Sequence, residues 1–292
     1  MNSRRIFIKQ AGIAAAGITL LPNFYCSPAP ETAKAVVLQV YTLKDELPKD
    51  VKSVIAKVAK AGYKEVETYG YTAETGFWGM NPKEFKALLD ENGLKAPSGH
   101  FGLDSYVKSG NVEELKPLIE GAAALSMEYF TCPWLDPALR TSIADYKTVA
   151  ARLTEAAKLC KASGLQLAYH NHDFEFTKYG NETGYDILLA ETDKDLVKFE
   201  MDLYWVVRSG NDPIALFEKH PGRFVMWHVK DMDKTNNTIN TEVGTGTIDF
   251  KSIYKHAKTA GLKHLIVEQE NFSIDPFESI KKSFDYVSRE LV

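Results

Sequence analysis

Residues 224–230 read FVMWHVK, and residues 264–270 read HLIVEQE. Each stretch is a short apolar run, rich in β-branched and aromatic residues, that ends in polar side chains. Such runs predict strands, and the helical periodicity that follows each of them predicts alternation of strands with helices. Six earlier runs of the same kind lie at residues 36–41, 65–69, 96–101, 129–134, 166–172 and 198–204.

Helical periodicity follows every predicted strand. The expected helices lie near 50–61, 82–92, 112–125, 145–163, 184–191, 212–219, 249–260 and 276–290. Left-handed glycines are expected just after four of them, at Gly62, Gly93, Gly164 and Gly261. N-caps are expected at Asn81, Asn111, Asp145, Asp212 and Asp249. Eight β-then-α units without a break in composition predict an α/β fold, a single (β/α)8 TIM barrel over residues 34–292. An open, doubly wound sheet is the alternative.

Charge and cysteine content narrow the class of protein. The chain carries 35 basic and 39 acidic residues, and its body has no basic run. We therefore expect no nucleic-acid partner. Cys26, Cys132 and Cys160 are too few and too scattered for a disulfide framework. Cys132 ends the fourth predicted strand, but no base is evident beside it, so we do not interpret it as a nucleophile.

The N-terminus has the pattern of a targeting segment. Residues 3–9 read SRRIFIK and precede a small-residue apolar stretch, an order that resembles a Tat export signal. This stretch is shorter than the ~20 residues of a membrane span, so none is expected. We assign residues 1–33 to an export signal and linker, which predicts a periplasmic protein. A lipid anchor at Cys26 is the alternative, although residues 23–25 match a lipobox poorly.

Chemically active side chains gather at the ends of the predicted strands. In a TIM barrel the active site lies at the C-terminal ends of the strands. The fifth to eighth strands each end in a residue able to bind a divalent cation. Glu200, between Phe199 and Met201, can instead be a buried ion-pair partner. The side chains at these ends are Glu67, His100, His170, His172, Glu200, Asp202, His228, Lys230, Glu268 and Glu270.

Five segments together resemble the sugar phosphate isomerase/epimerase superfamily, the xylose isomerase-like TIM barrels also called AP endonuclease family 2. They are AYHNHDFEF (168–176), FEMDLYWV (199–206), WHVKDMD (227–233), EVGTGTIDF (242–250) and VEQE (267–270). The resemblance covers residue 36 to the end of the chain. It implies one divalent cation, which can be Mn, Co, Mg, Zn or Fe. The implied ligands are His170 (or His172), Asp202, His228 and Glu268.

The resemblance also implies a reaction. A metal-dependent isomerase or epimerase of a non-phosphorylated sugar would remove a proton next to the carbonyl and form an enediolate that the metal stabilises. Glu268, Glu270, His170 or His172 would accept the proton, and Lys230 would offset the negative charge. Export favours a free sugar, because phosphosugars are kept inside cells. Substrate contacts are expected from Glu67, His100 and Glu270, with an apolar wall of Trp78, Trp134, Tyr204 and Trp205.

The fifth strand departs from the family pattern and leaves alternatives open. Ketose epimerases of the family usually carry glutamate there, whereas this chain has His170-Asn171-His172. The alternative is a lyase or dehydratase of keto-sugars or 3-keto-glycosides with the same metal site. An AP endonuclease-like nuclease is disfavoured by the acidic charge, and a non-catalytic sugar-binding protein by the full ligand set. A homo-oligomer stays open. We interpret the glycines of residues 242–250 as a tight turn before Asp249, rather than as a phosphate loop.

Overall fold

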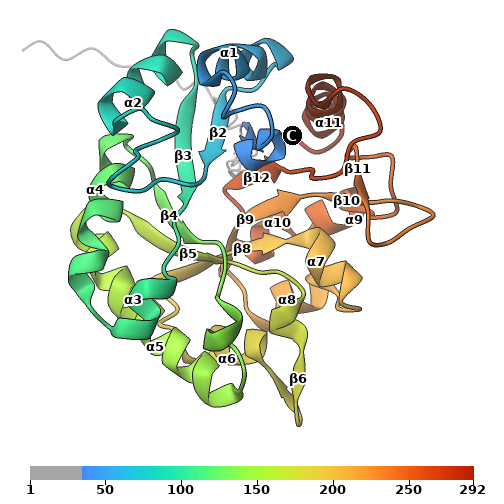
Figure 1. Cartoon of the computed structure of the whole chain (residues 1–292). Coiled ribbons are helices and arrows are strands. Elements are labelled where there is room, and N and C mark those ends of the chain that lie inside the picture. Colours follow the sequence, from blue (N-terminus) through green and yellow to red (C-terminus); the bar gives the residue numbers. More distant parts are fainter. Residues whose placement is uncertain (1–34) are drawn as a thin grey trace, which may run out of the picture.

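The computed structural model describes residues 35–292, which form a closed parallel barrel (Figure 1). Neighbouring strands follow the order β1-β12-β9-β8-β5-β4-β3-β2. The barrel strands are β1 (Val36–Gln39), β2 (Glu65–Thr68), β3 (Lys95–His100), β4 (Tyr129–Cys132), β5 (Gln166–His170), β8 (Val197–Asp202), β9 (Phe224–Val229) and β12 (His264–Val267). Closure confirms the predicted barrel and excludes the open sheet. The export signal and Cys26 lie outside the described residues.

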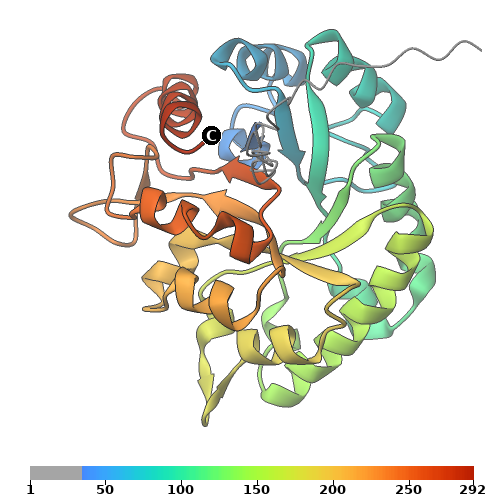
Figure 2. The same ribbon diagram turned by 180° about the vertical axis from the view of Figure 1, so that it is seen from behind.

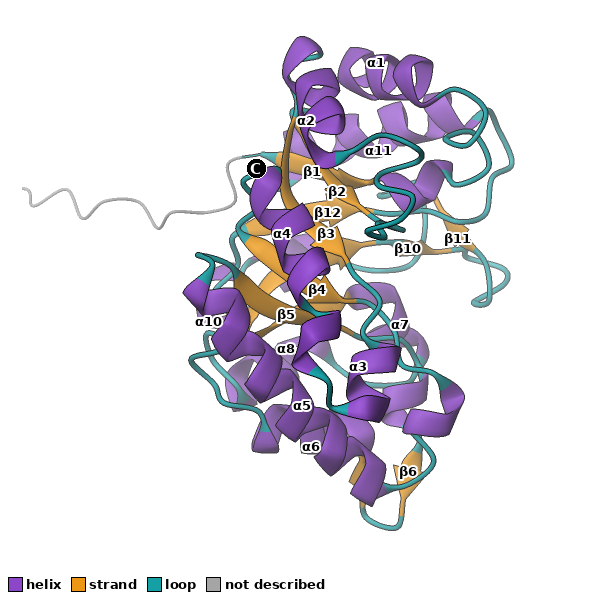
Figure 3. Ribbon diagram, turned by 60° about the vertical axis from the view of Figure 1, so that its left-hand side comes forward, coloured by secondary structure: helices purple, strands orange, loops and turns teal. Residues whose placement is uncertain are grey.

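Helices surround the strands on the outside of the barrel, as Figures 2 and 3 show. They are α1 (Val51–Ala61), α2 (Pro82–Glu91), α3 (Asp104–Ser109), α4 (Lys116–Ala124), α5 (Ile143–Ala162), α6 (Gly184–Glu191), α7 (Leu203–Arg208), α8 (Pro213–Lys219), α9 (Phe250–Tyr254), α10 (Ala257–Ala260) and α11 (Pro276–Glu290). Short 3-10 turns lie at Val40–Leu43, Val112–Glu114, Pro137–Leu139 and Phe174–Phe176. Two small hairpins pair β6 (Lys178–Tyr179) with β7 (Glu182–Thr183) and β10 (Asp231–Met232) with β11 (Asn240–Thr241).

Several boundaries differ from the prediction for local reasons. The sixth barrel strand ends at Asp202 rather than residue 204, because the Asp202 side chain accepts the Trp205 N–H and starts α7. Asp145 does not cap α5; Ser142 does so, three residues earlier. Asn111 caps only a 3-10 turn. The other expected caps and all four left-handed glycines are confirmed.

The core has two parts. A small cluster fills the inside of the barrel, and a much larger one lies between the strands and the surrounding helices. The inner cluster consists of Val37, Tyr129, Ala168, Val225, Met226 and Ile266. In strands, residues two apart face the same side. On β9, Met226 and His228 therefore both face the inside of the barrel. His228 brings a polar side chain to the barrel axis, above the apolar layer.

The glycine loop wraps around a buried carboxylate. Asp231 accepts backbone N–H groups from Gly244 and Gly246, each at 2.9 Å, and from Ile248 at 3.1 Å. A Cβ on Gly246 would lie 2.2 Å from the Met232 carbonyl oxygen, so only glycine fits there. Asp249 then caps α9, as expected. In residues 35–292, no helix has the length and apolar character needed to cross a bilayer.

Candidate metal centre

Four side chains from neighbouring strand ends converge at the C-terminal face of the barrel. They are the predicted ligands His170, Asp202, His228 and Glu268, from β5, β8, β9 and the residue after β12. One potential ligand atom from each lies within 4.8 Å of the others. Asp202 Oδ2 lies 3.6 Å from His170 Nε2 and 3.8 Å from His228 Nδ1. His228 Nδ1 lies 3.1 Å from Glu268 Oε2. We call these four residues the upper group.

The surroundings of the upper group leave ligand atoms free. His170 Nδ1 lies 3.4 Å from the Pro133 carbonyl oxygen, which can only accept a hydrogen bond. Nδ1 therefore carries a proton, and in the neutral imidazole the Nε2 lone pair is free to bind a cation. Asp202 uses Oδ1 to cap α7. His170 Nε2 and Asp202 Oδ2 are buried without a hydrogen-bond partner among residues 35–292, as expected of atoms that hold a cation. Two imidazoles and two carboxylates suit a divalent cation.

Asn171 links two of these strand ends, and the sequence did not point to it as a functional residue. Its Oδ1 accepts the Asp202 N–H and the Tyr185 hydroxyl, each at 3.2 Å. Its Nδ2 donates to the Asp202 carbonyl oxygen at 3.4 Å. Asn171 is fully buried. It therefore fixes the end of β8, where Asp202 stands, against the end of β5, where His170 stands.

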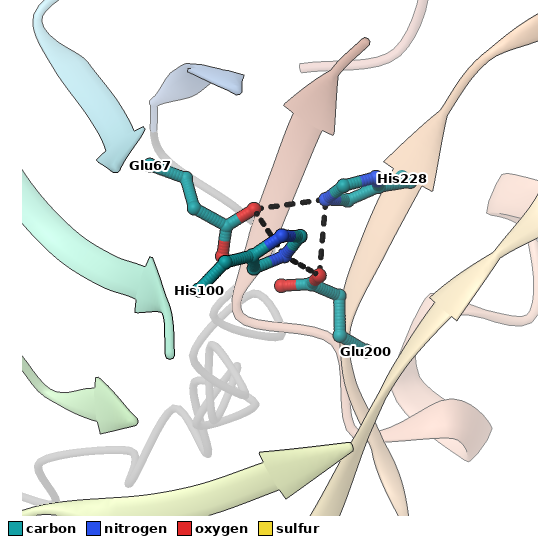
Figure 4. A group of neighbouring side chains, drawn as sticks. All are labelled: Glu67, His100, Glu200 and His228. Atoms are coloured by element: carbon teal, nitrogen blue, oxygen red, sulfur yellow. Dashed lines mark hydrogen bonds and ion pairs between the residues drawn. The ribbon is translucent and has the colours of Figure 1, made fainter. Parts of the chain in front are cut away.

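A second group lies deeper in the barrel and shares His228 (Figure 4). His228 Nε2 lies 2.8 Å from Glu67 Oε2 and 3.0 Å from Glu200 Oε1. His100 Nε2 lies 2.8 Å from Glu200 Oε1 and 3.2 Å from Glu67 Oε2. Glu200 is thus buried and ion-paired, the role the sequence allowed for it. Glu67 is fully buried beneath the cavity floor, so it faces these histidines instead of the expected substrate hydroxyl. We call Glu67, His100, Glu200 and His228 the lower ring.

Opposite charges dominate the ionisation of both groups in the metal-free protein. Burial by itself lowers the pKa of His100, but Glu67 and Glu200 outweigh it and raise that pKa to about 10. Burial likewise opposes the charge on Glu67, whose pKa nevertheless lies well below its usual range because of His100 and His228. Glu268 behaves in the same way: burial raises its pKa, and Lys230 and His228 lower it further than burial raises it.

Lys230 sits between two carboxylates at the edge of the site. Its Nζ lies 3.1 Å from Glu268 Oε2 and also pairs with Glu270. Glu270 additionally contacts Lys44, at 3.5 Å. Burial lowers the pKa of Lys230, but Glu268, Asp202 and Glu270 together raise it above its ordinary value. The ammonium therefore stays charged and holds the eighth-strand carboxylates in place.

The upper group opens into a cavity of about 440 Å³. This volume lies within the ~300–1,000 Å³ usual for small-molecule sites. Most of the predicted substrate contacts and proton acceptors line it, namely His100, Trp134, His170, His172, Trp205, Lys230, Glu268 and Glu270. Tyr41 and Tyr69, which the sequence did not single out, also line it, and Tyr41 packs edge-on against Tyr69 with ring centroids 4.9 Å apart.

The expected apolar wall is only half formed by the residues named from the sequence. Trp134 and Trp205 line the cavity, but Trp78 and Tyr204 do not. Trp78 packs behind Tyr69, with ring centroids 5.2 Å apart. Tyr204 turns away because it lies in α7 rather than in a strand, and its hydroxyl donates to the Asn237 carbonyl oxygen. Both therefore support the wall from behind.

His172 differs from the other two histidines of the cavity because it has no carboxylate partner among residues 35–292, although its ring lies edge-on to His170 with centroids 4.8 Å apart. Its ring packs against Trp134, Phe174 and Trp205, and its Nδ1 is buried without a partner among the described residues. Burial lowers the pKa of His172 well below its ordinary value, and the nearby charges of His170 and Lys230 add to this. The imidazole is therefore neutral near pH 7, with one nitrogen free to accept a proton.

Glu175 holds the loop that carries His172, and the sequence did not reveal it. Its Oε2 accepts the His172 backbone N–H at 2.8 Å, and its Oε1 accepts the Tyr169 hydroxyl at 2.6 Å. Burial raises the pKa of Glu175 to about 7, although the bond from Tyr169 opposes that rise. A carboxylate in the segment HDFEF gave no signal by itself, because nothing in the pattern shows that it turns inward.

Comparison with known proteins places this architecture in a family. Residues 55–290 match the family of xylose isomerase-like TIM barrels, and the chain belongs to it. A sugar phosphate isomerase/epimerase from Parabacteroides distasonis is 27% identical and superposes with a TM-score of 0.76, over 91% of this chain and 97% of that one. A D-allulose 3-epimerase from Methylomonas sp. shares the fold, at 16% identity, a TM-score of 0.70, and coverage of 90% of this chain and 99% of that one.

Inosose dehydratases are among the curated relatives. The enzyme of Lacticaseibacillus casei is 26% identical over 162 residues, which are 49% of this chain and 54% of that protein. The enzyme of Lactiplantibacillus plantarum is 24% identical over 279 residues, 83% of this chain and 89% of that protein. Several matches, including the first, thus span only about half the length of the relative.

Proposed function

We propose that this protein is a carbohydrate-modifying enzyme that uses a divalent cation to remove a proton next to the carbonyl of a sugar-like ketone. The observation that carries the proposal is the upper group, which opens into a cavity beside the neutral imidazole of His172. Relatives named inosose dehydratase, epimerase and isomerase support the same class of chemistry.

His170, Asp202, His228 and Glu268 would hold the cation. When bound, the cation supplies electrophilic assistance to a carbonyl and lowers the pKa of the neighbouring C–H. The chain then has to provide a proton acceptor within reach of that carbon. Of the three histidines that line the cavity, His170 and His100 face carboxylates. His172 has no ion pair among residues 35–292, so we assign it the proton transfer.

Elimination is the outcome we propose after proton removal. His172 accepts the proton from the carbon next to the carbonyl, and the electron pair forms a double bond to the adjacent carbon. The C–O bond at that carbon breaks, and the proton on His172 passes to the departing oxygen, which leaves as water or as an alcohol. One proton-transfer group suffices for this sequence. Epimerisation needs a proton acceptor and a donor on opposite faces of the carbon, and Glu268 is held by Lys230 and His228.

An isomerase or epimerase is the second candidate. It is favoured by the Parabacteroides distasonis protein, which the alignment covers over 97% of its length. In this candidate Glu270, which lines the cavity and whose side chain is 30% exposed, would act as the second proton-transfer group beside His172. A non-phosphorylated substrate is proposed for both candidates, because glutamates already neutralise the two cationic side chains of the cavity lining. Lys230 pairs with Glu268 and Glu270, and His100 pairs with the two glutamates of the lower ring.

Deuterium exchange tests the proposal. Metal-reconstituted protein is incubated in D₂O with inosose, simple keto-sugars and 3-keto-glycosides. Elimination is expected to give an unsaturated ketone that absorbs in the ultraviolet, together with water or a released alcohol. Epimerisation or isomerisation instead gives a product of unchanged formula with one deuterium. No product and no deuterium with any of these substrates would refute proton abstraction.

We further propose that the protein is exported in folded form. The support is the pair Arg4-Arg5 ahead of the apolar stretch. Replacement of both arginines by lysine is expected to keep the protein in the cytoplasm, as measured by cell fractionation. Unchanged periplasmic recovery of that variant would contradict export through the twin-arginine signal.

A further inference from the structure

We infer that the lower ring, Glu67, His100, Glu200 and His228, is a second divalent-cation site, which shares His228 with the upper group. The ring is a closed cycle of alternating carboxylate oxygen and imidazole nitrogen. The four sides measure 2.8, 3.0, 2.8 and 3.2 Å. Figure 4 shows the two carboxylates facing each other across the two imidazoles.

These distances match a ring of ligands around an ion. An octahedral cation such as Mg²⁺ binds its ligand atoms at about 2.1 Å, so adjacent ligands at right angles lie about 3.0 Å apart. All four sides of the ring lie close to that value. The ring also offers two nitrogens and two oxygens, a mixture that suits Zn, Co, Mn or Fe.

Hydrogen bonds by themselves explain the four short distances of the ring less well than a central ion does. Each Nε2 can carry one proton, and a hydrogen bond is strong only when its N–H points straight at one acceptor. Yet Nε2 of His100 and Nε2 of His228 each lie close to both Glu67 and Glu200. An ion in the middle of the ring contacts all four atoms at once, whereas two protons favour two of the four sides.

Two further observations point to a ligand. Glu67 Oε1 and Glu200 Oε2 are buried without a hydrogen-bond partner in the part of the chain that the structure describes. A carboxylate that chelates a cation with both oxygens uses such atoms. In addition, Gln39 Nε2 donates to Glu67 Oε2 at 2.8 Å, while Gln39 Oε1 accepts the Tyr41 N–H at 2.9 Å. The bond from the Tyr41 N–H holds the amide oxygen of Gln39 away from the ring, so the amide nitrogen faces Glu67.

The position of the ring in the fold differs from that of the upper group. The upper group joins strands that follow one another around the wall, β5, β8, β9 and β12. The lower ring joins β2 and β3 to β8 and β9, two strand pairs that lie on opposite sides of the barrel. An ion in the ring therefore ties the two sides together at the floor of the cavity, where His100 contributes to the lining.

His228 connects the two sites because it presents Nε2 to the ring and Nδ1 to the upper group. One imidazole that binds two cations does so through both nitrogens, as imidazolate, and releases its N–H proton. Loss of His228 should therefore empty both sites. Loss of Glu200 should empty only the lower ring, and loss of Asp202 only the upper group.

Metal content tests this inference. Purified protein is stripped with chelator, dialysed against Co²⁺ and analysed for cobalt. We expect two Co²⁺ ions per chain in the wild type, one in Glu200→Gln, one in Asp202→Asn and none in His228→Gln. His264→Gln is the control, because His264 is also a strand histidine paired with a glutamate, Glu65, but lies outside both groups. It should keep both ions.

One Co²⁺ in the wild type, or two in Glu200→Gln, would overturn the inference. Circular dichroism shows whether each variant folds. If Glu200→Gln does not fold, crystals of the wild type loaded with Co²⁺ decide the matter by anomalous diffraction. A peak within the lower ring supports the inference, and a peak confined to the upper group refutes it. Neither measurement depends on catalytic activity.

Discussion

His228 Nε2 lies 2.8 Å from Glu67 Oε2, although 161 positions separate the two residues in the chain. The opposite nitrogen of the same imidazole lies 3.1 Å from Glu268 Oε2. One side chain on β9 therefore links the buried lower ring to the upper group at the floor of the cavity. The effects of metal on stability and on activity should both depend on this residue.

Removal of metal should destabilise the protein. A ligand present at about 100 times its Kd stabilises the folded state by about 2.7 kcal/mol. For a domain of this size that corresponds to a rise in Tm of roughly 5–10 °C. We expect EDTA to lower the Tm by at least this amount, which is the contribution of one ion, and Co²⁺ to restore it. His228→Gln should abolish the response, and a Tm shift of wild-type size in that variant would contradict a role of His228 in metal binding.

His172→Gln should separate proton transfer from metal binding. The imidazole contacts the cavity and belongs to neither metal group, so the variant should keep its Co²⁺ content. Loss of a general acid–base group typically lowers kcat by about 10²–10⁴-fold. We expect that loss with an active substrate and little change in KM. A kcat within a factor of a few of the wild type would show that another group moves the proton.

Asn171→Leu should weaken the upper group without removing a ligand. The variant loses the bonds that fix Asp202 and leaves the Tyr185 hydroxyl without its partner. Changes to such outer bonds typically cost about 10–100-fold in metal affinity. Isothermal titration with Co²⁺ measures this loss. Asn92→Leu is a matched control, since within residues 35–292 the Asn92 side chain donates only to the Leu88 carbonyl oxygen, at the end of α2. Equal affinities for both variants would argue against a role for Asn171.

Glu175 should make stability depend on pH. Burial raises its pKa to about 7, above the ~4.3 of an unfolded chain. The folded state therefore binds the extra proton, and this stabilisation is fully present below pH ~4.3 and lost as pH rises through ~7. Urea unfolding of the metal-free wild type should show a free energy of unfolding that falls between pH 5 and pH 8. In Glu175→Gln this fall should be smaller by about 3 kcal/mol. Parallel curves for both proteins would contradict the raised pKa.

Gly246→Ala should destabilise the barrel end that carries Lys230. The added methyl group would lie 2.2 Å from the Met232 carbonyl oxygen and 2.4 Å from the Asp231 carboxylate. A clash with backbone at a buried loop should cost about 1–3 kcal/mol in the free energy of unfolding. Gly102→Ala serves as control, because no atom of the described part of the chain lies within 4 Å of its Cβ position and its φ is not left-handed. A cost below about 0.5 kcal/mol for Gly246→Ala would count against this packing.

The sequence by itself determined the barrel and the residues gathered at its mouth. Eight repeats of strand and helix predict a closed barrel, and parallel strands bring all their C-terminal ends to one face. For that reason the side chains at these strand ends are expected to lie together. The resemblance to the family then implied His170 (or His172), Asp202, His228 and Glu268 as ligands, and the structure brings His170, Asp202, His228 and Glu268 together. The sequence predicted the ends of the strands less accurately, because local caps such as Asp202 end a strand without a change in the apolar pattern.

Only the tertiary structure decided which side chains face the cavity and which lie beneath it. Glu67 and Glu200 meet His100 and His228 because two strand pairs on opposite sides of the barrel approach each other across its axis, and that distance depends on the tilt and stagger of the closed barrel. Trp78 and Trp134 look alike in sequence, yet only Trp134 lines the cavity, because loop geometry sets its direction. The periodicity of apolar residues determines neither the tilt of the strands nor the path of a loop.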